Sequence, residues 1–381
     1  MTLKGHKRHS DIQKPLFGNY ARNEWAILGT NCEDIKSLSQ KIFKELSSQY
    51  CCAYIDTTHA DDKTEPINNI TAGIVIDYLN CINYEQVKYK TTFNSFQHKE
   101  LFSSCDLVLV NGNHQEAKAQ IVVIDEKKKA SLQKKLNQLN NIKLILLKDI
   151  ENDIFSFIKE LLPDNGSIPI IQFSDTEKII GFFKNKLINA QPELNGLILA
   201  GGKSVRLGKD KSKINWHGKE QRYYVADLLK QSCKNVYISC REEQRAEIDA
   251  TYNIIIDTFT GLGPYGAILS AFREYPDKAW LIVACDLPLV NKNTIELLIN
   301  NRNCSSLATT FKSSHDGLPE PLITIWEPKS YPILLSFLAQ GVSCPRKVLI
   351  NNNTHIIEPN NPEDLLNVNT EDDLNIVKGY L

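Results

Sequence analysis

Residues 199–211, Leu-Ala-Gly-Gly-Lys-Ser-Val-Arg-Leu-Gly-Lys-Asp-Lys, decide the fold of the second half of this chain. They follow the apolar run 194–200, which predicts a buried strand, and they precede a helix expected over 222–231. Glycines directly after a strand let backbone N–H groups approach a nucleotide without interference from a Cβ atom. Arg206 and Lys211 then supply fixed cations for a polyphosphate. The order of strand, loop and helix therefore indicates a nucleotide-binding α/β unit.

This loop matches neither of two common phosphate-binding motifs. It lacks the GxxxxGK[ST] spacing of a P-loop and the GxGxxG spacing of a dinucleotide fingerprint. The alternative is a surface loop that is merely rich in glycine and lysine. That alternative explains the glycines or the cations, but not both in this order after a buried strand.

Length and composition set the class of protein. A chain of 381 residues is too long for one ordinary core, and 42% hydrophobic with 23% charged residues is typical of a globular protein. The formal net charge of -1 argues against a nucleic-acid binder. No apolar run is long enough to span a membrane, and the first residues have no apolar signal segment. Because the ten cysteines are scattered without metal spacing, we expect a reducing, cytoplasmic location.

Strands and helices alternate through both halves, the pattern of parallel sheets covered by helices. Two three-layer α/β domains are therefore expected, 1–190 and 191–381, joined by a linker at 189–193. Strands are expected at 25–28, 52–55, 107–110, 121–124, 143–147, 168–173, 194–200, 236–239, 253–256 and 280–284. Helices are expected over 35–46, 154–162 and 222–231. Another is expected to begin near Lys127, and a further one to begin at a capping box at 174–177 and to end at about 187. The stretch from 56 to 80 is expected to be irregular.

The loop at 199–211 resembles LAGGxSxRxGxDK, the opening motif of the molybdenum cofactor guanylyltransferase family. The resemblance runs from about Leu194 to Leu381. Further pieces fall in the family's order: Asp257, Gly261–Gly266, Cys285–Pro288 and Asn367–Leu374. The resemblance implies a Rossmann-like nucleotidyltransferase that uses Mg²⁺ and moves GMP from GTP to molybdopterin, with release of pyrophosphate. The implied partners are these substrates and a molybdoenzyme or cofactor-insertion protein.

The resemblance also implies a role for each matching residue. Backbone groups of the 199–202 loop are expected to hold guanine and ribose, with Asp257 on the nucleoside, Arg206 and Lys211 on the phosphates, and Asp286 on Mg²⁺. The loop residues are Leu199, Ala200, Gly201 and Gly202. A carboxylate at the end of a parallel strand independently suits a hard cation, although Asp286 could instead cap a turn.

Asn367 and Asn369 match family positions that face the pterin substrate. The alternative is structural, because Thr370 to Asp373 also predicts an N-capped helix with acids in its first turn. At the end of the strand 236–239, many relatives carry an asparagine that contacts the base, whereas this chain has Ser239. A hydroxyl cannot mimic an amide, so guanine selectivity is expected to rest on the 201–202 loop.

The first half more loosely resembles the P-loop adaptor protein that accompanies molybdopterin guanylation in bacteria. Its phosphate loop corresponds to Gly29–Ser37, but Ile35 stands where glycine is usual, and Glu33 and Asp34 place carboxylates where a polyphosphate would bind. Asn111 replaces an acidic residue after a later strand. We therefore expect a degenerate P-loop-like domain that acts as a non-hydrolysing adaptor; the alternative is a working GTPase.

Three other functions remain open for the second half. A sugar-phosphate nucleotidyltransferase also begins LAGG, but usually with a longer spacing between the arginine and the lysine. A cytidylyltransferase acting on molybdopterin normally shows AAG at this point. The chain could also be a non-catalytic carrier of molybdopterin, which retention of Arg206, Lys211 and Asp286 argues against.

Overall fold

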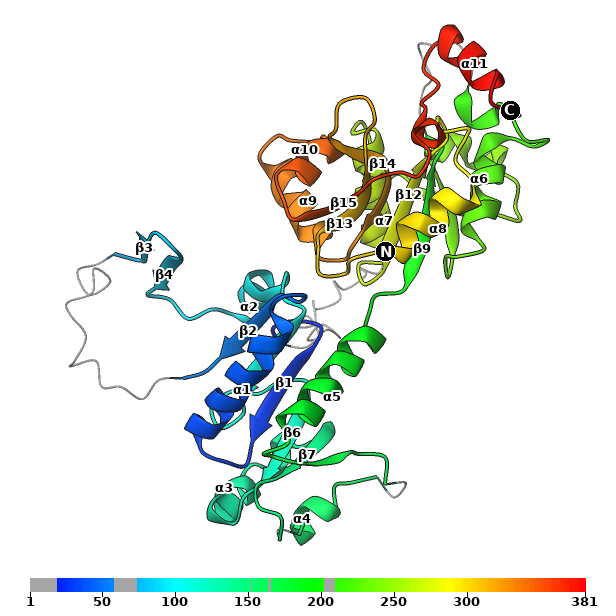
Figure 1. Cartoon of the computed structure of the whole chain (residues 1–381). Coiled ribbons are helices and arrows are strands. Elements are labelled where there is room, and N and C mark those ends of the chain that lie inside the picture. The colour runs from blue at the N-terminus through cyan, green and yellow to red at the C-terminus, as the bar shows by residue number, and fades with distance from the viewer. Residues whose placement is uncertain (1–18, 58–73, 152, 164–165, 202–209) are drawn as a thin grey trace, which may run out of the picture. The chain divides into compact units, whose positions relative to one another are not determined.

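The computed structural model describes residues 19–57, 74–151, 153–163, 166–201 and 210–381 (Figure 1). The chain divides into two compact units, Met1–Ala190 and Gln191–Leu381, and the boundary falls in the expected linker. Each unit is a β-sheet with helices on its faces, and each is described by itself. No helix in the described ranges is long and apolar enough to cross a bilayer.

The second unit is built on a seven-stranded sheet with the order β11-β10-β9-β12-β14-β13-β15. The first four strands of this order are parallel, whereas β14 is antiparallel to both β12 and β13. The strands are β9 (Leu194–Leu199), β10 (Val236–Cys240), β11 (Asn253–Ile256), β12 (Ala279–Ala284), β13 (Ala308–Lys312), β14 (Pro319–Trp326) and β15 (Thr354–Ile357). Parallel pairing brings the carboxyl ends of β9 to β12 to the same edge of the sheet.

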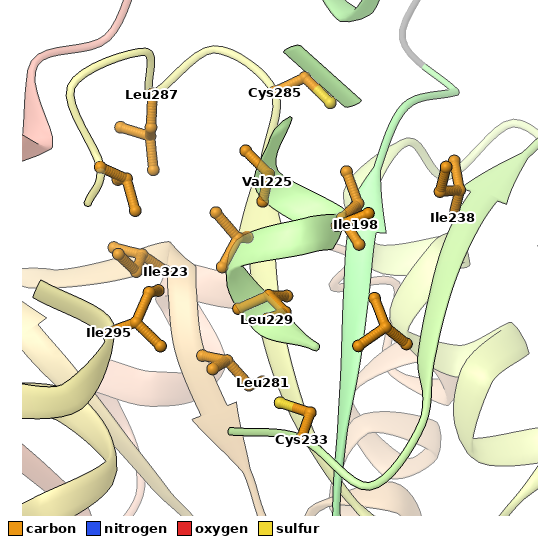
Figure 2. Close-up of a cluster of buried hydrophobic side chains, with 14 of the residues drawn as sticks. Ile198, Val225, Leu229, Cys233, Ile238, Leu281, Cys285, Leu287, Ile295 and Ile323 are labelled. Atoms are coloured by element: carbon orange, nitrogen blue, oxygen red, sulfur yellow. The ribbon is translucent and has the colours of Figure 1, made fainter. Parts of the chain in front are cut away.

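Helices cover both faces of this sheet. They are α6 (Gln221–Leu229), α7 (Pro264–Glu274), α8 (Lys292–Asn300), α9 (Ser330–Ala339), α10 (Pro345–Ile350) and, at the end of the chain, α11 (Glu371–Lys378). Leu281 of β12 packs with Leu229 of α6 and Ile295 of α8 in one core (Figure 2). The adjacent Trp280 points to the other face, where α7, α9 and α10 enclose it. The second unit therefore has the expected three layers.

The first unit holds a six-stranded sheet with the order β2-β5-β1-β6-β7-β8, in which every pairing is parallel. The strands are β1 (Glu24–Leu28), β2 (Cys52–Ile55), β5 (Leu107–Asn111), β6 (Ala119–Ile124), β7 (Ile142–Leu147) and β8 (Ile170–Gln172). The helices are α1 (Cys32–Leu46), α2 (Ser95–Phe102), α3 (Lys129–Gln133), α4 (Ser156–Lys159) and α5 (Thr176–Asn189). Ile27 packs in the core with α1 and α5, and Leu28 in the core with α3 and α4.

Several expectations for the first unit are wrong in detail. The stretch expected to be irregular ends in a strand, β3 (Ile76–Asn80), which pairs with β4 (Glu85–Tyr89) as an antiparallel hairpin. The helix expected over 154–162 is only the single turn of α4, because Phe155 and Ile158 alone are buried there. The helix expected from Lys127 is a 3₁₀ turn followed by the short α3. The cap of α5 is Asp175, whose carboxylate accepts a hydrogen bond from the backbone of Lys178.

Gly266 allows α7 to pack against the loop that precedes it. A Cβ atom at Gly266 would lie 2.1 Å from the carbonyl oxygen of Phe259, so any side chain must push the two segments apart. We expect Gly266→Ala to lower the free energy of unfolding by about 1–3 kcal/mol through overpacking. The matched control is Gly181→Ala in α5, where nothing lies within 4 Å of the added atom. Urea denaturation measures both changes, and equal effects of the two would contradict the packing described.

Candidate active site

A cavity of about 700 Å³ opens at the carboxyl ends of the parallel strands of the second unit. Seven of the predicted site residues line it: Leu199, Ala200, Gly201, Lys211, Ser239, Asp257 and Asp286. Gly202 and Arg206 lie outside the described residues, and Asn367 and Asn369 are not part of the lining. The parallel sheet thus brings together residues that are widely separated in the sequence.

One side of the cavity is formed by the ends of β9, β10 and β11. The backbone N–H of Ala200 donates to the carbonyl of Ser239, and the N–H of Asp257 donates to the carbonyl of Cys240. Gly201 then passes so close to the Asp257 carboxylate that a Cβ atom would lie 3.0 Å from Oδ2. The glycine therefore leaves the Asp257 side chain room beside the loop backbone.

Ser239 holds the Asp257 carboxylate in place. Its Oγ donates to Asp257 Oδ1 over 2.6 Å, and Ser239 is itself fully buried. Burial raises the pKa of the Asp257 carboxyl above its usual value, whereas the Ser239 hydroxyl and the nearby Arg241 lower it. The Ser239 hydroxyl is thus already hydrogen-bonded to a carboxylate. Asp257 is therefore the residue of this pair that can offer a polar group to a ligand in the cavity.

Asp286 follows β12 and contributes a second carboxylate to the cavity. The residue as a whole is half-buried, yet its Oδ1 is buried without a hydrogen-bond partner in the described structure. Burial raises the pKa of this carboxyl; the charge of Lys211 and a hydrogen bond from the residue's own backbone oppose that effect, and the charge of Glu320 adds to it. A buried acceptor without a donor is costly, so a cation or donor from a ligand fits this atom.

Lys211 connects the nucleotide loop to the C-terminal segment. Its Nζ donates to Asn369 Oδ1 over 2.7 Å, although the two residues are 158 positions apart. The backbone N–H of Val368 donates to the carbonyl of Asp286, which ties the same segment to the end of β12. The predicted acceptor residue Asn369 therefore lies beside the predicted phosphate-binding lysine, while Asn367 is exposed.

The predicted helix start after Asn369 is confirmed. Thr370 caps α11 by accepting from the backbone of Asp373, and Asp373 Oδ2 accepts from the backbone N–H groups of Thr370 and Asn369. These bonds lower the pKa of the Asp373 carboxyl, those from the Asn369 and Thr370 backbones most. The helix cap at Thr370 is compatible with the contact between Asn369 and Lys211. The cap fixes the backbone from which the Asn369 side chain reaches Lys211.

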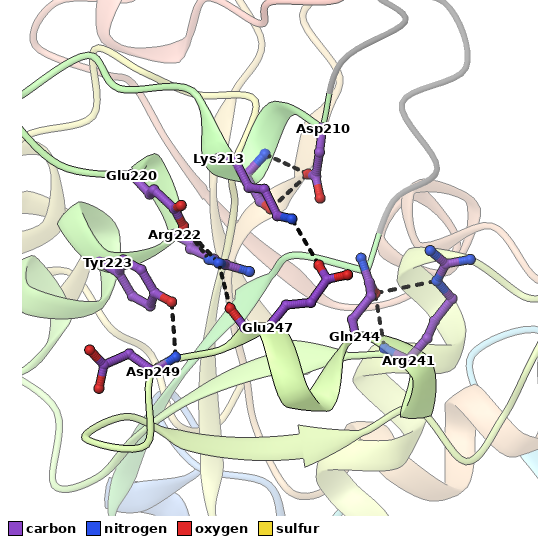
Figure 3. Close-up of polar contacts among 10 residues, drawn as sticks. Asp210, Lys213, Glu220, Arg222, Tyr223, Arg241, Gln244, Glu247 and Asp249 are labelled. Atoms are coloured by element: carbon purple, nitrogen blue, oxygen red, sulfur yellow. Dashed lines mark hydrogen bonds and ion pairs between the residues drawn. The ribbon is translucent and has the colours of Figure 1, made fainter.

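Sequence reasoning missed the loop after β10, which supplies Arg241, Glu242 and Glu243 to the cavity wall. Figure 3 shows how this loop is fastened. Arg222 of α6 donates to the carbonyl of Glu247 over 2.9 Å, and Lys213 forms an ion pair with the Glu247 carboxylate at 2.8 Å. The sequence did contain one indication that this loop lines the site. The loop directly follows a parallel strand, and open α/β sheets bind ligands at the carboxyl ends of such strands.

The corresponding edge of the first unit is different. Only three residues, 29–31, separate β1 from α1, so most of the segment expected as a degenerate phosphate loop is helical. Asn31 caps α1, and the Asp34 carboxylate accepts from Thr30 and Asn31 and pairs with Lys148. Lys36 is exposed one turn into the helix. Carboxylate and amide groups thus fill the start of α1, where an incoming phosphate would need free N–H groups.

Comparison with known proteins concerns the second unit. Residues 196–355 match the family model of the MobA-like NTP transferase domain. A "Molybdenum cofactor biosynthesis bifunctional protein" from Synechocystis is 35% identical over 185 residues, which cover 48% of this chain and 53% of that protein. The match thus spans about half the length of this relative. The second unit is therefore similar to the MobA-like NTP transferase domain over residues 196–355.

Further similarity involves shorter proteins. A "Molybdenum cofactor guanylyltransferase" from Pseudomonas putida is 28% identical over 170 residues, which cover 42% of this chain and 85% of that protein. The solved structure of "Molybdopterin-guanine dinucleotide biosynthesis protein A" from Archaeoglobus fulgidus is also similar. The match covers 49% of this chain and 97% of that chain, with 22% sequence identity and a TM-score of 0.42.

Lys36, in the segment that corresponds to a phosphate loop, and Lys211, which lines the cavity, should differ in their effect on GTP binding. We expect one GTP site per chain in titration calorimetry, because the start of α1 is filled by Asp34 and its partners. Lys36→Ala should leave GTP affinity unchanged, whereas the matched Lys211→Ala should weaken it by about ten-fold or more, the loss of a charge-assisted contact of about 1.5–3 kcal/mol. A second GTP site that disappears in Lys36→Ala would show that the first unit binds nucleotide.

Proposed function

We propose that the second unit transfers GMP from GTP to molybdopterin, which yields the guanine dinucleotide form of the cofactor and pyrophosphate. The observation that carries the proposal is the presence of Asp286 and Lys211 in the cavity, with Asn369 hydrogen-bonded to Lys211. A partnerless carboxylate oxygen and a lysine suit a polyphosphate with its metal ion, and the asparagine beside the lysine offers an amide to the acceptor. The names of the similar proteins support the same reaction.

The chemistry of the donors fits a magnesium ion at Asp286. No cluster of three or more His, Cys, Asp or Glu side chains that could hold a metal occurs among the described residues. Mg²⁺ does not need such a cage, because it is usually bound by one or two carboxylates together with substrate phosphates and water. The buried Oδ1 of Asp286 would supply the protein's ligand. The ion would neutralise negative charge on the triphosphate.

The reaction needs alignment more than acid–base catalysis. The phosphate monoester of molybdopterin is largely a dianion at neutral pH, since its second pKa is about 6. An oxygen of this phosphate attacks the α-phosphorus of GTP, a new P–O bond forms, and the bond to pyrophosphate breaks. Two anions must therefore be brought together in line. Lys211 offsets their repulsion, and Asn369 beside it offers an uncharged amide to the acceptor.

The nucleoside is expected between the Leu199–Gly201 backbone and Asp257. The glycine at 201 lets the loop backbone lie against the base, and the Ser239 hydrogen bond keeps the Asp257 carboxylate from rotating. Ser239 then acts through Asp257 rather than on the base. The first unit, which shows a short turn where a phosphate loop was expected, is proposed to serve as a non-hydrolysing adaptor for the transferase or for the protein that receives its product.

Removing the charge of Asp286 tests the metal role. Asp286→Asn keeps the shape of the side chain, and we expect single-turnover guanylation to slow by roughly a hundred- to a thousand-fold, the usual worth of one charge-stabilising group of about 3–4 kcal/mol. Equilibrium binding of molybdopterin should survive. A near wild-type rate would mean that Asp286 is only a turn residue and that the metal site lies elsewhere.

The paired change Asn367→Ala with Asn369→Ala tests the acceptor side. Both residues belong to the segment held against Asp286 and Lys211, so we expect molybdopterin binding to weaken more than GTP binding. The loss of about two neutral hydrogen bonds predicts a decrease of roughly ten- to a hundred-fold in acceptor affinity. Binding of each substrate is measured separately by fluorescence titration. A loss confined to GTP would contradict the assignment of this segment to the acceptor.

A further inference from the structure

A cysteine and a histidine meet in the first unit. The Sγ atom of Cys32 lies 3.2 Å from Nε2 of His114, and Nδ2 of Asn113 lies 3.6 Å from the same sulfur. Cys32 and His114 are both half-buried, so neither residue is sealed in the core of the unit. This contact joins two segments 82 positions apart in the chain.

The fold builds this pair from two neighbouring parallel strands. β1 and β5 are paired along their length, so the turns that follow them leave the same edge of the sheet. The N–H of Gly112 donates to the carbonyl of Ile27 over 2.9 Å, and a Cβ atom at this glycine would lie 2.9 Å from the Cβ of Leu28. Asn113 Nδ2 also donates to the carbonyl of Thr30 over 2.9 Å. These contacts hold the turn after β5 against the start of α1.

A histidine, an amide and the start of a helix surround the sulfur. Cys32 is the first residue of α1, a helix of 15 residues. Lys135 donates to the carbonyl oxygens of Gly112 and Asn113 in the neighbouring turn. A histidine within hydrogen-bond distance of a thiol can accept its proton, and the thiolate is the nucleophilic form.

The acidic groups near the pair have other partners. On α1, Asp34 pairs with Lys148 and accepts from Thr30 and Asn31, and Glu33 is exposed. After β2, Asp56 accepts from the Tyr54 hydroxyl and from Asn111, and after β6, Asp125 accepts from Thr30. Among the described residues, the hydrogen-bond partners of the Cys32 sulfur are His114 and Asn113 rather than these carboxylates.

We propose that Cys32 is a nucleophilic thiol that undergoes exchange with small disulfides, and that His114 is the residue that activates it. In the reaction, the proton of the Cys32 thiol passes to His114, and the sulfur attacks one sulfur of a disulfide RSSR. A bond between Cys32 Sγ and that sulfur forms, the original S–S bond breaks, and RS⁻ leaves. The first unit thereby gains a covalent, thiol-reversible modification site that is independent of guanylyl transfer.

Two other cysteines are natural controls within the same chain. Cys344 is exposed and stands at the N-terminus of α10, but no histidine contacts its sulfur among the described residues. Cys51 is also exposed, and its Sγ lies 3.9 Å from that of Cys105. If exposure decided reactivity, both would react faster than Cys32. If the histidine decides it, Cys32 reacts first.

The experiment treats the full chain with oxidised glutathione at pH 6.5 and follows each cysteine by mass spectrometry of peptides. We expect Cys32 to be modified about five-fold or more faster than Cys344, because His114 can accept the thiol proton as the sulfur attacks, whereas no histidine among the described residues contacts Cys344. His114→Gln should slow Cys32 to the rate of Cys344. The rate at Cys344 should not change.

Thermal melting and the circular dichroism spectrum of the same variant report whether it is folded. Should His114→Gln melt early, Asn113→Ala removes one donor to the sulfur while leaving the histidine, and a smaller slowing at Cys32 is expected. The proposal is overturned if Cys32 reacts no faster than Cys344 in the wild-type protein. It is equally overturned if a folded His114→Gln variant modifies Cys32 at the wild-type rate.

Discussion

The site of the second unit depends on the parallel pairing of β9 with β10 on one side and β12 on the other. Leu199, the last residue of β9, is in register with both Ser239 and Ala284. The glycine loop, the loop after β10 and Asp286 must therefore leave the sheet at the same level. A slip of one residue in either pairing would turn alternate side chains to the opposite face and separate these groups.

Asp257 and Asp286, two of the carboxylates that line the cavity, differ in their hydrogen bonding. Asp257 accepts a short hydrogen bond from Ser239, whereas Oδ1 of Asp286 is buried with no donor in the described structure. Leaving such an acceptor unpaired costs roughly 1–3 kcal/mol, which the rest of the unit must offset. An oriented carboxylate and an unsatisfied one beside Lys211 suit an enzyme that binds a nucleoside at one end and charged phosphates at the other.

Residue patterns predicted the four parallel strands of the second unit, because buried strands such as 280–284 and the turn after each of them are local features. They missed the other three strands of that sheet, β13, β14 and β15. The sequence also indicated Asp286 and Lys211 as members of one site. It could not indicate that Asn369 contacts Lys211, since only tertiary packing joins positions so far apart. The hairpin β3–β4 was missed because its side chains are largely exposed, and the Cys32–His114 contact because no spacing rule relates two turns.

The central claim is that this cavity makes a guanine dinucleotide of a pterin phosphate. The most direct test supplies the full chain with molybdopterin, Mg²⁺ and an equimolar mixture of labelled GTP and CTP, and identifies the nucleotide in the product. The account predicts a product that contains guanosine, with one pyrophosphate released for each molecule formed. Equal incorporation of cytidine would contradict the guanylyl assignment, and the absence of any dinucleotide product would contradict transfer itself.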